Sequence, residues 1–222
     1  MRGLDFSTAS FFYTAMKINT NFLNRLRYTL YTPVYDSVAK IFSSSRKKAI
    51  GNLGLQAGDK VLLIGAGTGL DLEYIPKDCI VTATDLTPSM VGRIRKRNQT
   101  LGLTLETLVM DGQKLSLPDN SFDKVILHLI LAVIPDPVAC LQEVERVLEP
   151  GGKISVFDKF VPGESKLSLT RRMLNPLTNL LFSDITRRPE PIVSQTGLRI
   201  ISDTPADFRG NFRILLVEKP VI

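Results

Sequence analysis

The sequence predicts an α/β fold in which helices cover both faces of one mostly parallel sheet. After residue 55, short apolar runs of strand type alternate with stretches of helical periodicity. This alternation is typical of parallel sheets, because a crossover between parallel strands needs a helix or a comparable length of chain. A glycine-rich turn also follows directly on the first of these strands. The 222 residues suffice for one such sheet and are too few for a second large domain.

The strands are expected where apolar and β-branched residues gather between turn residues, and the helices where apolar residues recur every three or four positions. The expected strands are 60–64, 80–84, 106–110, 124–131, 153–158, 198–203 and 212–218. The expected helices are 35–53, 70–75, 88–101, 137–148 and 166–181. We therefore expect a seven-stranded, mostly parallel sheet within one main domain at 34–222, preceded by a helical extension at 1–33.

The extension has an amphipathic pattern. Apolar residues three or four positions apart form one stripe of a helix within 7–31. The stripe consists of Phe11, Ala15, Ile18, Phe22, Leu26 and Leu30. Two interpretations stay open: the helix packs on the domain as a lid over a pocket, or it contacts a membrane.

The net charge of +6 is concentrated at the N-terminus. Residues 1–48 contain eight basic residues and only two acidic ones, Asp5 and Asp36. The basic residues are Arg2, Lys17, Arg25, Arg27, Lys40, Arg46, Lys47 and Lys48. Such asymmetry favours an anionic partner at this end, either a membrane surface or a nucleic acid.

No segment suggests membrane insertion or export. The longest apolar run, 125–134, is shorter than the ~20 residues of a membrane-spanning helix, and Asp5 interrupts the stretch that a signal peptide keeps apolar. Cys79 and Cys140 have neither the number of a disulfide framework nor the spacing of a zinc site. We expect a cytoplasmic protein with reduced thiols and no metal centre.

The segment 61–72 is an apolar strand that continues into Gly65, Gly67 and Gly69 and then a helix. Glycine at these positions adopts the dihedrals of a tight turn and lets a ligand approach the backbone. A dinucleotide-binding fingerprint has its third glycine at the position of Leu70, and a P-loop has Lys followed by Ser or Thr. The spacing therefore argues against NAD, FAD and a P-loop.

Acidic residues end the next two expected strands. Asp85 stands where a carboxylate can accept hydrogen bonds from both ribose hydroxyls of an adenosine. Asp111 can accept from the adenine amino group, and Gly112 allows close approach to the ring. Together with the glycine-rich turn, these residues predict an adenosine-containing cofactor.

These segments and 148–155 resemble the motifs of class I S-adenosylmethionine-dependent methyltransferases in their order and spacing, over residues 55–158. The resemblance implies the Rossmann-like methyltransferase fold, with 34–222 as the methyltransferase domain, and S-adenosyl-L-methionine as the cofactor. It implies cofactor contacts from Gly65, Ala66, Gly67, Gly69, Asp85, Leu86, Met90, Asp111, Gly112 and His128. One departure is Leu63, where most of the family has an acidic residue that helps to hold the methionine end; Asp71 is a candidate replacement.

His128, the single histidine, lies on the strand that ends beside the methyl group in this fold. Two interpretations stay open, a buried core residue or a contact to cofactor or acceptor. The Asn/Asp-Pro-Pro-aromatic motif of enzymes that methylate the amino groups of bases is missing here. We therefore expect no nucleic-acid partner.

The outer segments 27–36, 46–48 and 182–221 are similar to bacterial cytoplasmic phosphatidylethanolamine N-methyltransferases. This resemblance implies a lipid acceptor at an anionic membrane surface, contacted through the basic N-terminal segment by a peripheral membrane protein. Tyr31 and Tyr35 are the candidates to surround the head-group nitrogen, because aromatic faces attract cations, although they can equally be core aromatics.

Three alternatives stay open. The first is a C-methyltransferase of prenylated quinone biosynthesis. Members of that group resemble one another in an Arg-Asn pair, and this sequence has Ala132 and Val133 at that position instead. The second is a small-molecule methyltransferase. The third is a cofactor-binding subunit without catalysis, which the departure at Leu63 suggests.

Overall fold

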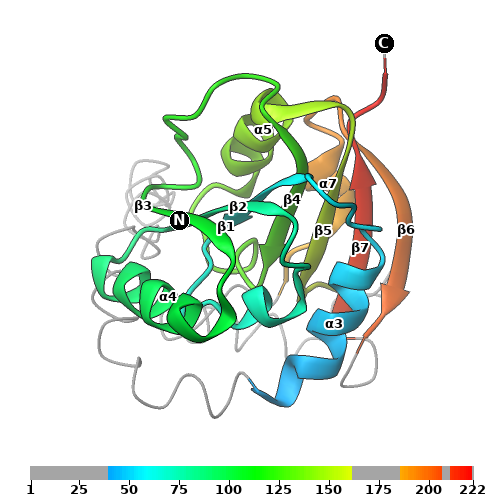
Figure 1. Ribbon diagram of the computed structural model, residues 1–222. Coiled ribbons are helices and arrows are strands. Elements are labelled where there is room, and N and C mark those ends of the chain that lie inside the picture. Colours follow the sequence, from blue (N-terminus) through cyan, green and yellow to red (C-terminus); the bar gives the residue numbers. More distant parts are fainter. Residues whose placement is uncertain (1–39, 162–185, 207–210, 222) are drawn as a thin grey trace, which may run out of the picture.

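The computed structural model describes residues 40–161, 186–206 and 211–221, and their fold is one seven-stranded sheet with helices on both faces (Figure 1). The strands are β1 Lys60–Ile64, β2 Ile80–Asp85, β3 Thr104–Val109, β4 Phe122–His128, β5 Leu148–Lys159, β6 Arg199–Pro205 and β7 Phe212–Glu218. The helices are the 3₁₀ turns η1 Lys40–Phe42 and η2 Leu70–Tyr74, and the α-helices α3 Ser43–Gly51, α4 Pro88–Leu101, α5 Pro137–Val147 and α7 Pro189–Val193.

The strand order is β3-β2-β1-β4-β5-β7-β6. The first five of these strands pair in parallel, and β7 is antiparallel to both of its neighbours. The predicted seven-stranded, mostly parallel sheet is thereby confirmed. The chain builds outward from β1 to β3 and then returns to β4, so the order reverses between β1 and β4. Ligands of open α/β sheets bind at the carboxyl ends of the strands at such a reversal.

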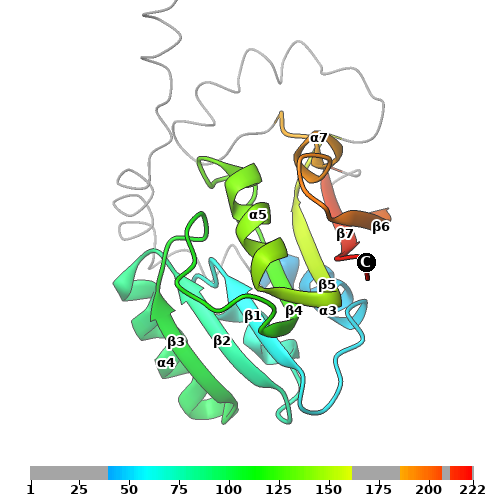
Figure 2. The same cartoon turned by 90° about the horizontal axis from the view of Figure 1, so that it is seen from above.

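Alternation along the strands supplies a core to each face. On β1, Leu62 and Ile64 join the cluster with residues of α5 and α7, whereas Val61 and Leu63 join the cluster with residues of α3 and α4. Figures 1 and 2 show the two helix layers on opposite sides of the sheet. Leu63 is 1% exposed, so an apolar side chain suits this position in the core.

Several boundaries differ from the sequence prediction. β4 ends at His128 instead of continuing to residue 131, because Leu129 has a left-handed φ of 59° that takes the chain out of the sheet. β5 begins at Leu148, where the expected strand began at 153, and α7 was not expected. The helix expected at 166–181 and the extension 1–33 lie outside the described residues. Within the described part of the chain, no helix is long and apolar enough to cross a membrane.

Candidate functional site

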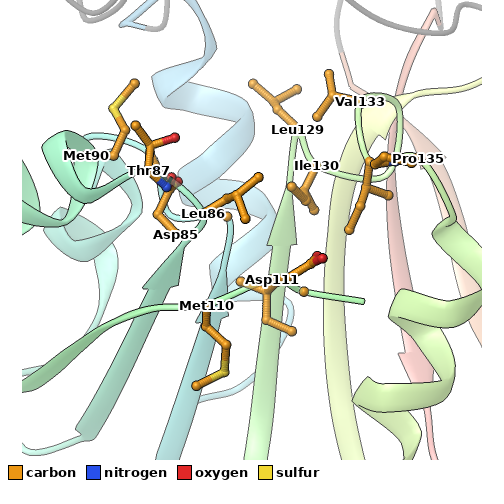
Figure 3. A pocket seen from close by; sticks show the side chains of 15 residues that line it. Asp85, Leu86, Thr87, Met90, Met110, Asp111, Leu129, Ile130, Val133 and Pro135 are labelled. Atoms are coloured by element: carbon orange, nitrogen blue, oxygen red, sulfur yellow. Dashed lines mark hydrogen bonds between the residues drawn. The ribbon is translucent and has the colours of Figure 1, made fainter. Parts of the chain in front are cut away.

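A pocket lies at the carboxyl edge of the sheet, where the strand order reverses. Its volume is about 670 Å³ including the open mouth, which is within the usual range for small-molecule sites. The loop after β2 forms one wall and the segment after β4 forms the other, with the glycine-rich turn and the loop after β3 between them (Figure 3). The lining residues are Ile64, Gly65, Gly67, Asp85, Leu86, Thr87, Met90, Met110, Asp111, Gly112, Leu129, Ile130, Val133, Ile134 and Pro135.

Asp85 is the carboxylate at the end of β2. Its Oδ2 accepts from the backbone N–H of Gly67 over 2.9 Å and its Oδ1 accepts from the N–H of Thr87 over 2.8 Å. Burial raises the pKa of Asp85, and these two N–H bonds offset the rise only in part. The side chain of Thr87 also hydrogen-bonds to Asp85, and a carboxylate offers about four acceptor positions, so roughly one stays available. That position can accept from a ribose hydroxyl.

Asp111 and Gly112 follow β3 at the floor of the pocket. Both oxygens of Asp111 accept from the side-chain amide of Gln113, at 3.0 and 3.2 Å, which fixes the carboxylate in a tight turn. A side chain at position 112 would meet Ile64, because a Cβ there would lie 2.7 Å from its Cγ2 atom. Gly112 is therefore required by the packing of β1 as well as by space for a ligand.

The three glycines of the turn have left-handed φ values of 65°, 57° and 79°, at Gly65, Gly67 and Gly69. Glycine was expected at these positions because it lets a ligand approach the backbone. At Gly65 the structure shows a second reason for glycine. A Cβ there would lie 2.6 Å from Cδ1 of Ile130, so the opposite wall packs directly on the turn. Gly69 lies outside the pocket lining and precedes η2, and Ala66 lies outside it too, with its N–H on the carbonyl of Thr84.

The wall after β4 is apolar and was missed by the sequence analysis. Leu129, Ile130, Val133, Ile134 and Pro135 line the pocket opposite Asp85, and Figure 3 shows four of them facing Thr87 and Met90 across the opening. The positive φ of Leu129 is a strained conformation for a residue with a branched side chain. The sequence signal was present in the apolar run that ends in Pro135, but it resembled a longer strand.

His128 belongs to a buried polar network instead of the pocket lining. Its Nδ1 lies 2.6 Å from Oδ1 of Asp71 and its Nε2 lies 2.9 Å from Oγ of Ser155. Arg46 on α3 donates to the other oxygen of Asp71. The side chains of Arg46, Asp71 and His128 are at most 5% exposed. The network therefore joins α3, η2, β4 and β5, and His128 directly precedes Leu129 of the pocket lining.

The hydrogen bonds show which groups donate and which accept in this network. Ser155 donates its one hydroxyl proton to the carbonyl of Ala49 over 3.1 Å, so Nε2 of His128 is the donor to Ser155. Burial favours the neutral form of Asp71, but the charges of His128 and Arg46 and their hydrogen bonds outweigh burial and lower the pKa of Asp71. Both oxygens of Asp71 are thus engaged by Arg46 and His128, and Asp71 lies outside the pocket lining.

The structure brings seven of the predicted cofactor residues into one pocket and leaves three outside it. Those inside are Gly65, Gly67, Asp85, Leu86, Met90, Asp111 and Gly112, and those outside are Ala66, Gly69 and His128. Tyr31 and Tyr35 lie outside the described residues. Their predicted roles at the acceptor stay predictions.

The pocket fits S-adenosylmethionine better than a phosphate-bearing dinucleotide. Its lining contains two carboxylates, Asp85 and Asp111, and no basic residue, which suits a cofactor with a sulfonium and an ammonium group. Only the short 3₁₀ turn η2 follows the glycines, so the long helix whose N-terminus binds a pyrophosphate is missing there. The glycine-rich floor also keeps the backbone accessible.

Fold and pocket together define a class I S-adenosylmethionine-dependent methyltransferase. Residues 62–156 match the family described as "Methyltransferase domain". The chain carries this domain and is an S-adenosylmethionine-dependent methyltransferase.

Among curated proteins, the chain is 28% identical over 189 residues to a phosphatidylethanolamine N-methyltransferase from Cereibacter sphaeroides, covering 84% of this chain and 93% of that protein. It is 40% identical over 110 residues to a ubiquinone/menaquinone biosynthesis C-methyltransferase from Chromobacterium violaceum, covering 47% and 45%. The chain thus spans nearly all of the first relative and less than half of the second.

Solved structures share the fold. A methyltransferase from Methanosarcina mazei superposes with a TM-score of 0.61 at 25% identity, covering 78% of this chain and 97% of that one. The [4+2]-cyclase SpnF superposes with a TM-score of 0.74 at 17% identity, covering 89% and 95%. Because SpnF carries the name of a different reaction, the fold alone does not define the chemistry.

Proposed function

We propose that this methyltransferase N-methylates the head group of phosphatidylethanolamine at a membrane surface. The main support is the extent of the similarity along the chain. The match to the quinone C-methyltransferase covers only about half of the chain, a length similar to that of the methyltransferase domain at 62–156. The match to the phosphatidylethanolamine enzyme covers 84% of the chain and so includes segments on which acceptor choice can depend.

The pocket is suited to transfer to a nucleophile sheltered from water. S-adenosylmethionine supplies a methyl group activated by a sulfonium. The chain's task is then to align the acceptor and exclude water, which can lower a barrier by roughly 7–11 kcal/mol at best. The apolar wall with Leu129, Ile130 and Val133 excludes water on one side, and the carboxylates of Asp85 and Asp111 favour cationic groups on the other.

The start of the described chain has features of a surface that contacts membranes. Ile41 is 62% exposed, Lys47 and Lys48 are exposed on α3, and α3 contains no acidic residue. Arg46 was expected to belong to this basic surface, but it is buried against Asp71. Basic side chains near anionic lipid contribute about 1 kcal/mol each, so peripheral attachment is part of the proposal.

The test is methyl transfer from labelled S-adenosylmethionine to liposomes of phosphatidylethanolamine and phosphatidylglycerol. We expect label in N-methylated phosphatidylethanolamine. We also expect the Lys47→Gln, Lys48→Gln double variant to bind these vesicles roughly thirtyfold more weakly, from about 2 kcal/mol of lost attraction. The control is Lys77→Gln, an exposed lysine in the loop between η2 and β2. Absence of labelled phospholipid rejects the proposed acceptor.

A second candidate acceptor is a prenylated quinone, because the identity to the quinone C-methyltransferase reaches 40% within the matched part. The same liposomes doped with a demethylated quinone separate the two candidates. Label in the quinone alone, with unlabelled phospholipid, establishes C-methylation instead.

A further inference from the structure

Two charged side chains hold the central peptide unit of the apolar wall from both ends. The N–H of Ala132 donates to Oδ2 of Asp158 over 2.9 Å, and the carbonyl of Leu131 accepts from Nη1 of Arg187. One peptide bond joins Leu131 to Ala132, and in a trans peptide the carbonyl and the N–H point in opposite directions. A carboxylate therefore lies at the positive end of this peptide dipole and a guanidinium lies at its negative end.

This peptide is the centre of the wall. Leu129 and Ile130 line the pocket before it and Val133, Ile134 and Pro135 line the pocket after it, whereas Leu131 and Ala132 point into the core and are at most 3% exposed. The wall also includes the positive φ of Leu129, a conformation that persists only where the surrounding structure imposes it. Movement of the central peptide displaces both halves of the wall.

The anchoring carboxylate is buried at the end of β5. Asp158 is 1% exposed, and its Oδ1 accepts from the N–H of Lys159 over 2.7 Å. Charged groups face it from three elements: Lys159 on its own strand, Arg187 before α7, and Arg213 opposite it on β7. Arg213 binds Asp203 over 2.6 Å.

We propose that Asp158 and Arg187 are positioning residues of the cofactor site, which grip the Leu131–Ala132 peptide and hold the apolar wall against the glycine-rich turn. The ionised carboxylate accepts from the N–H groups of Ala132 and Lys159 at once. The protonated acid carries a hydroxyl in place of one acceptor oxygen, which weakens the hydrogen bonds from these two N–H groups.

Burial raises the pKa of Asp158 from 3.8 to about 6, and the backbone N–H bonds and the charges of Lys159 and Arg187 offset the rise only in part. Two consequences of opposite sign follow. The ionised carboxylate, which holds the wall through the N–H of Ala132, predominates above pH ~6, and this hold is lost below that pH as Asp158 is protonated. The fold, in contrast, gains stability from a neutral Asp158, and this contribution is lost as the pH rises from about 3.8 to about 6.

The test is calorimetric binding of S-adenosylhomocysteine to the full chain between pH 5 and pH 8. The wild type should lose affinity as the pH falls, with a midpoint near 6. Asp158→Asn should bind about tenfold more weakly at pH 7.5, the effect of losing a hydrogen bond to a charged group, and should lack that midpoint. Arg187→Met should also bind more weakly. The matched control, Asp203→Asn, removes the neighbouring carboxylate that binds Arg213 and should behave as the wild type.

The thermal midpoint separates a positioning role from a structural one. Because the buried charge is costly, Asp158→Asn should melt no lower than the wild type at pH 7.5 while binding more weakly. Loss of affinity accompanied by a matching loss of stability overturns the proposal, as does unchanged affinity. In the wild type, the amide proton resonance of Ala132 should titrate with the same midpoint as binding. A resonance that stays constant between pH 5 and pH 8 contradicts the proposal without any variant.

Discussion

Replacing Asp71 by Asn should destabilise the protein far more than the loss of a surface carboxylate. The substitution keeps the shape of the side chain and removes the negative charge that the guanidinium of Arg46 binds in the core. Both side chains are at most 5% exposed, so the magnitude for a buried pair applies, about 3–5 kcal/mol, and not the 0–1 kcal/mol of an exposed pair. At about 2–4 °C per kcal/mol for a chain of this size, the thermal midpoint should fall by roughly 6–20 °C.

The chain provides a matched control on the same 3₁₀ turn. Glu73 pairs with Arg97 over 2.5 Å, with side chains 44% and 20% exposed. Glu73→Gln should therefore cost less than about 1 kcal/mol in urea denaturation followed by circular dichroism. The reasoning is refuted if Asp71→Asn and Glu73→Gln have free energies of unfolding within 1 kcal/mol of each other.

A double variant tests whether the buried charge of Arg46 is the cause. Arg46→Met added to Asp71→Asn removes the guanidinium and keeps an apolar stem of similar length in the core. It should recover at least half of the stability lost in the single variant, because buried ion pairs are often replaced by apolar residues without loss. A double variant less stable than Asp71→Asn would show that Arg46 stabilises α3 independently of Asp71.

Three further predictions concern pH, packing and strain. Because the folded-state pKa of Asp71 is lowered, its contribution to stability is complete above its ordinary value of 3.8 and should be lost as the pH falls further, which Asp71→Asn should abolish in acid denaturation. Gly112→Val should weaken binding of S-adenosylhomocysteine at least tenfold and lower the thermal midpoint, because its Cβ would lie 2.7 Å from Ile64; calorimetry showing wild-type affinity would be inconsistent with this packing. Leu129 has a left-handed φ, a backbone strain of about 1–3 kcal/mol, which glycine does not have. Leu129→Gly should therefore recover part of the stability that is lost with the leucine side chain. Leu129→Gly should therefore have a higher urea midpoint of unfolding than Leu129→Ala. The reverse order would show that the backbone at Leu129 is not strained.

The sequence predicted well what depends on local pattern. Short apolar runs, such as the one in 60–64, located the strands, and the glycine spacing together with Asp85 located the cofactor pocket before any geometry was known. These signals are local because a strand end and the turn that follows it are adjacent in the chain. Asp85 and Gly67 are 18 residues apart and meet because β1 and β2 are neighbours in a parallel sheet.

Long-range polar contacts could not be predicted in this way. Asp71 meets His128 from 57 residues away, and no pattern within either segment indicates that pairing. The same holds for Ala132, whose partner Asp158 is 26 residues distant. Arg46 was interpreted as part of a basic surface because charge counts carry no information on burial. The end of β4 was placed too late, since the left-handed turn at Leu129 is made by a residue type that rarely adopts it.

The central claim is that the carboxylate of Asp85 holds S-adenosylmethionine at the reversal of the strand order. The most direct measurement is calorimetric binding of S-adenosylhomocysteine to the wild type, to Asp85→Ala and to the control Asp203→Asn, which lies outside the pocket lining, at pH 7.5. The account predicts that Asp85→Ala, still folded by circular dichroism, binds at least tenfold more weakly while Asp203→Asn keeps wild-type affinity, because hydrogen bonds to a charged group contribute about 1.5–3 kcal/mol. Equal affinity of Asp85→Ala and the wild type would contradict it.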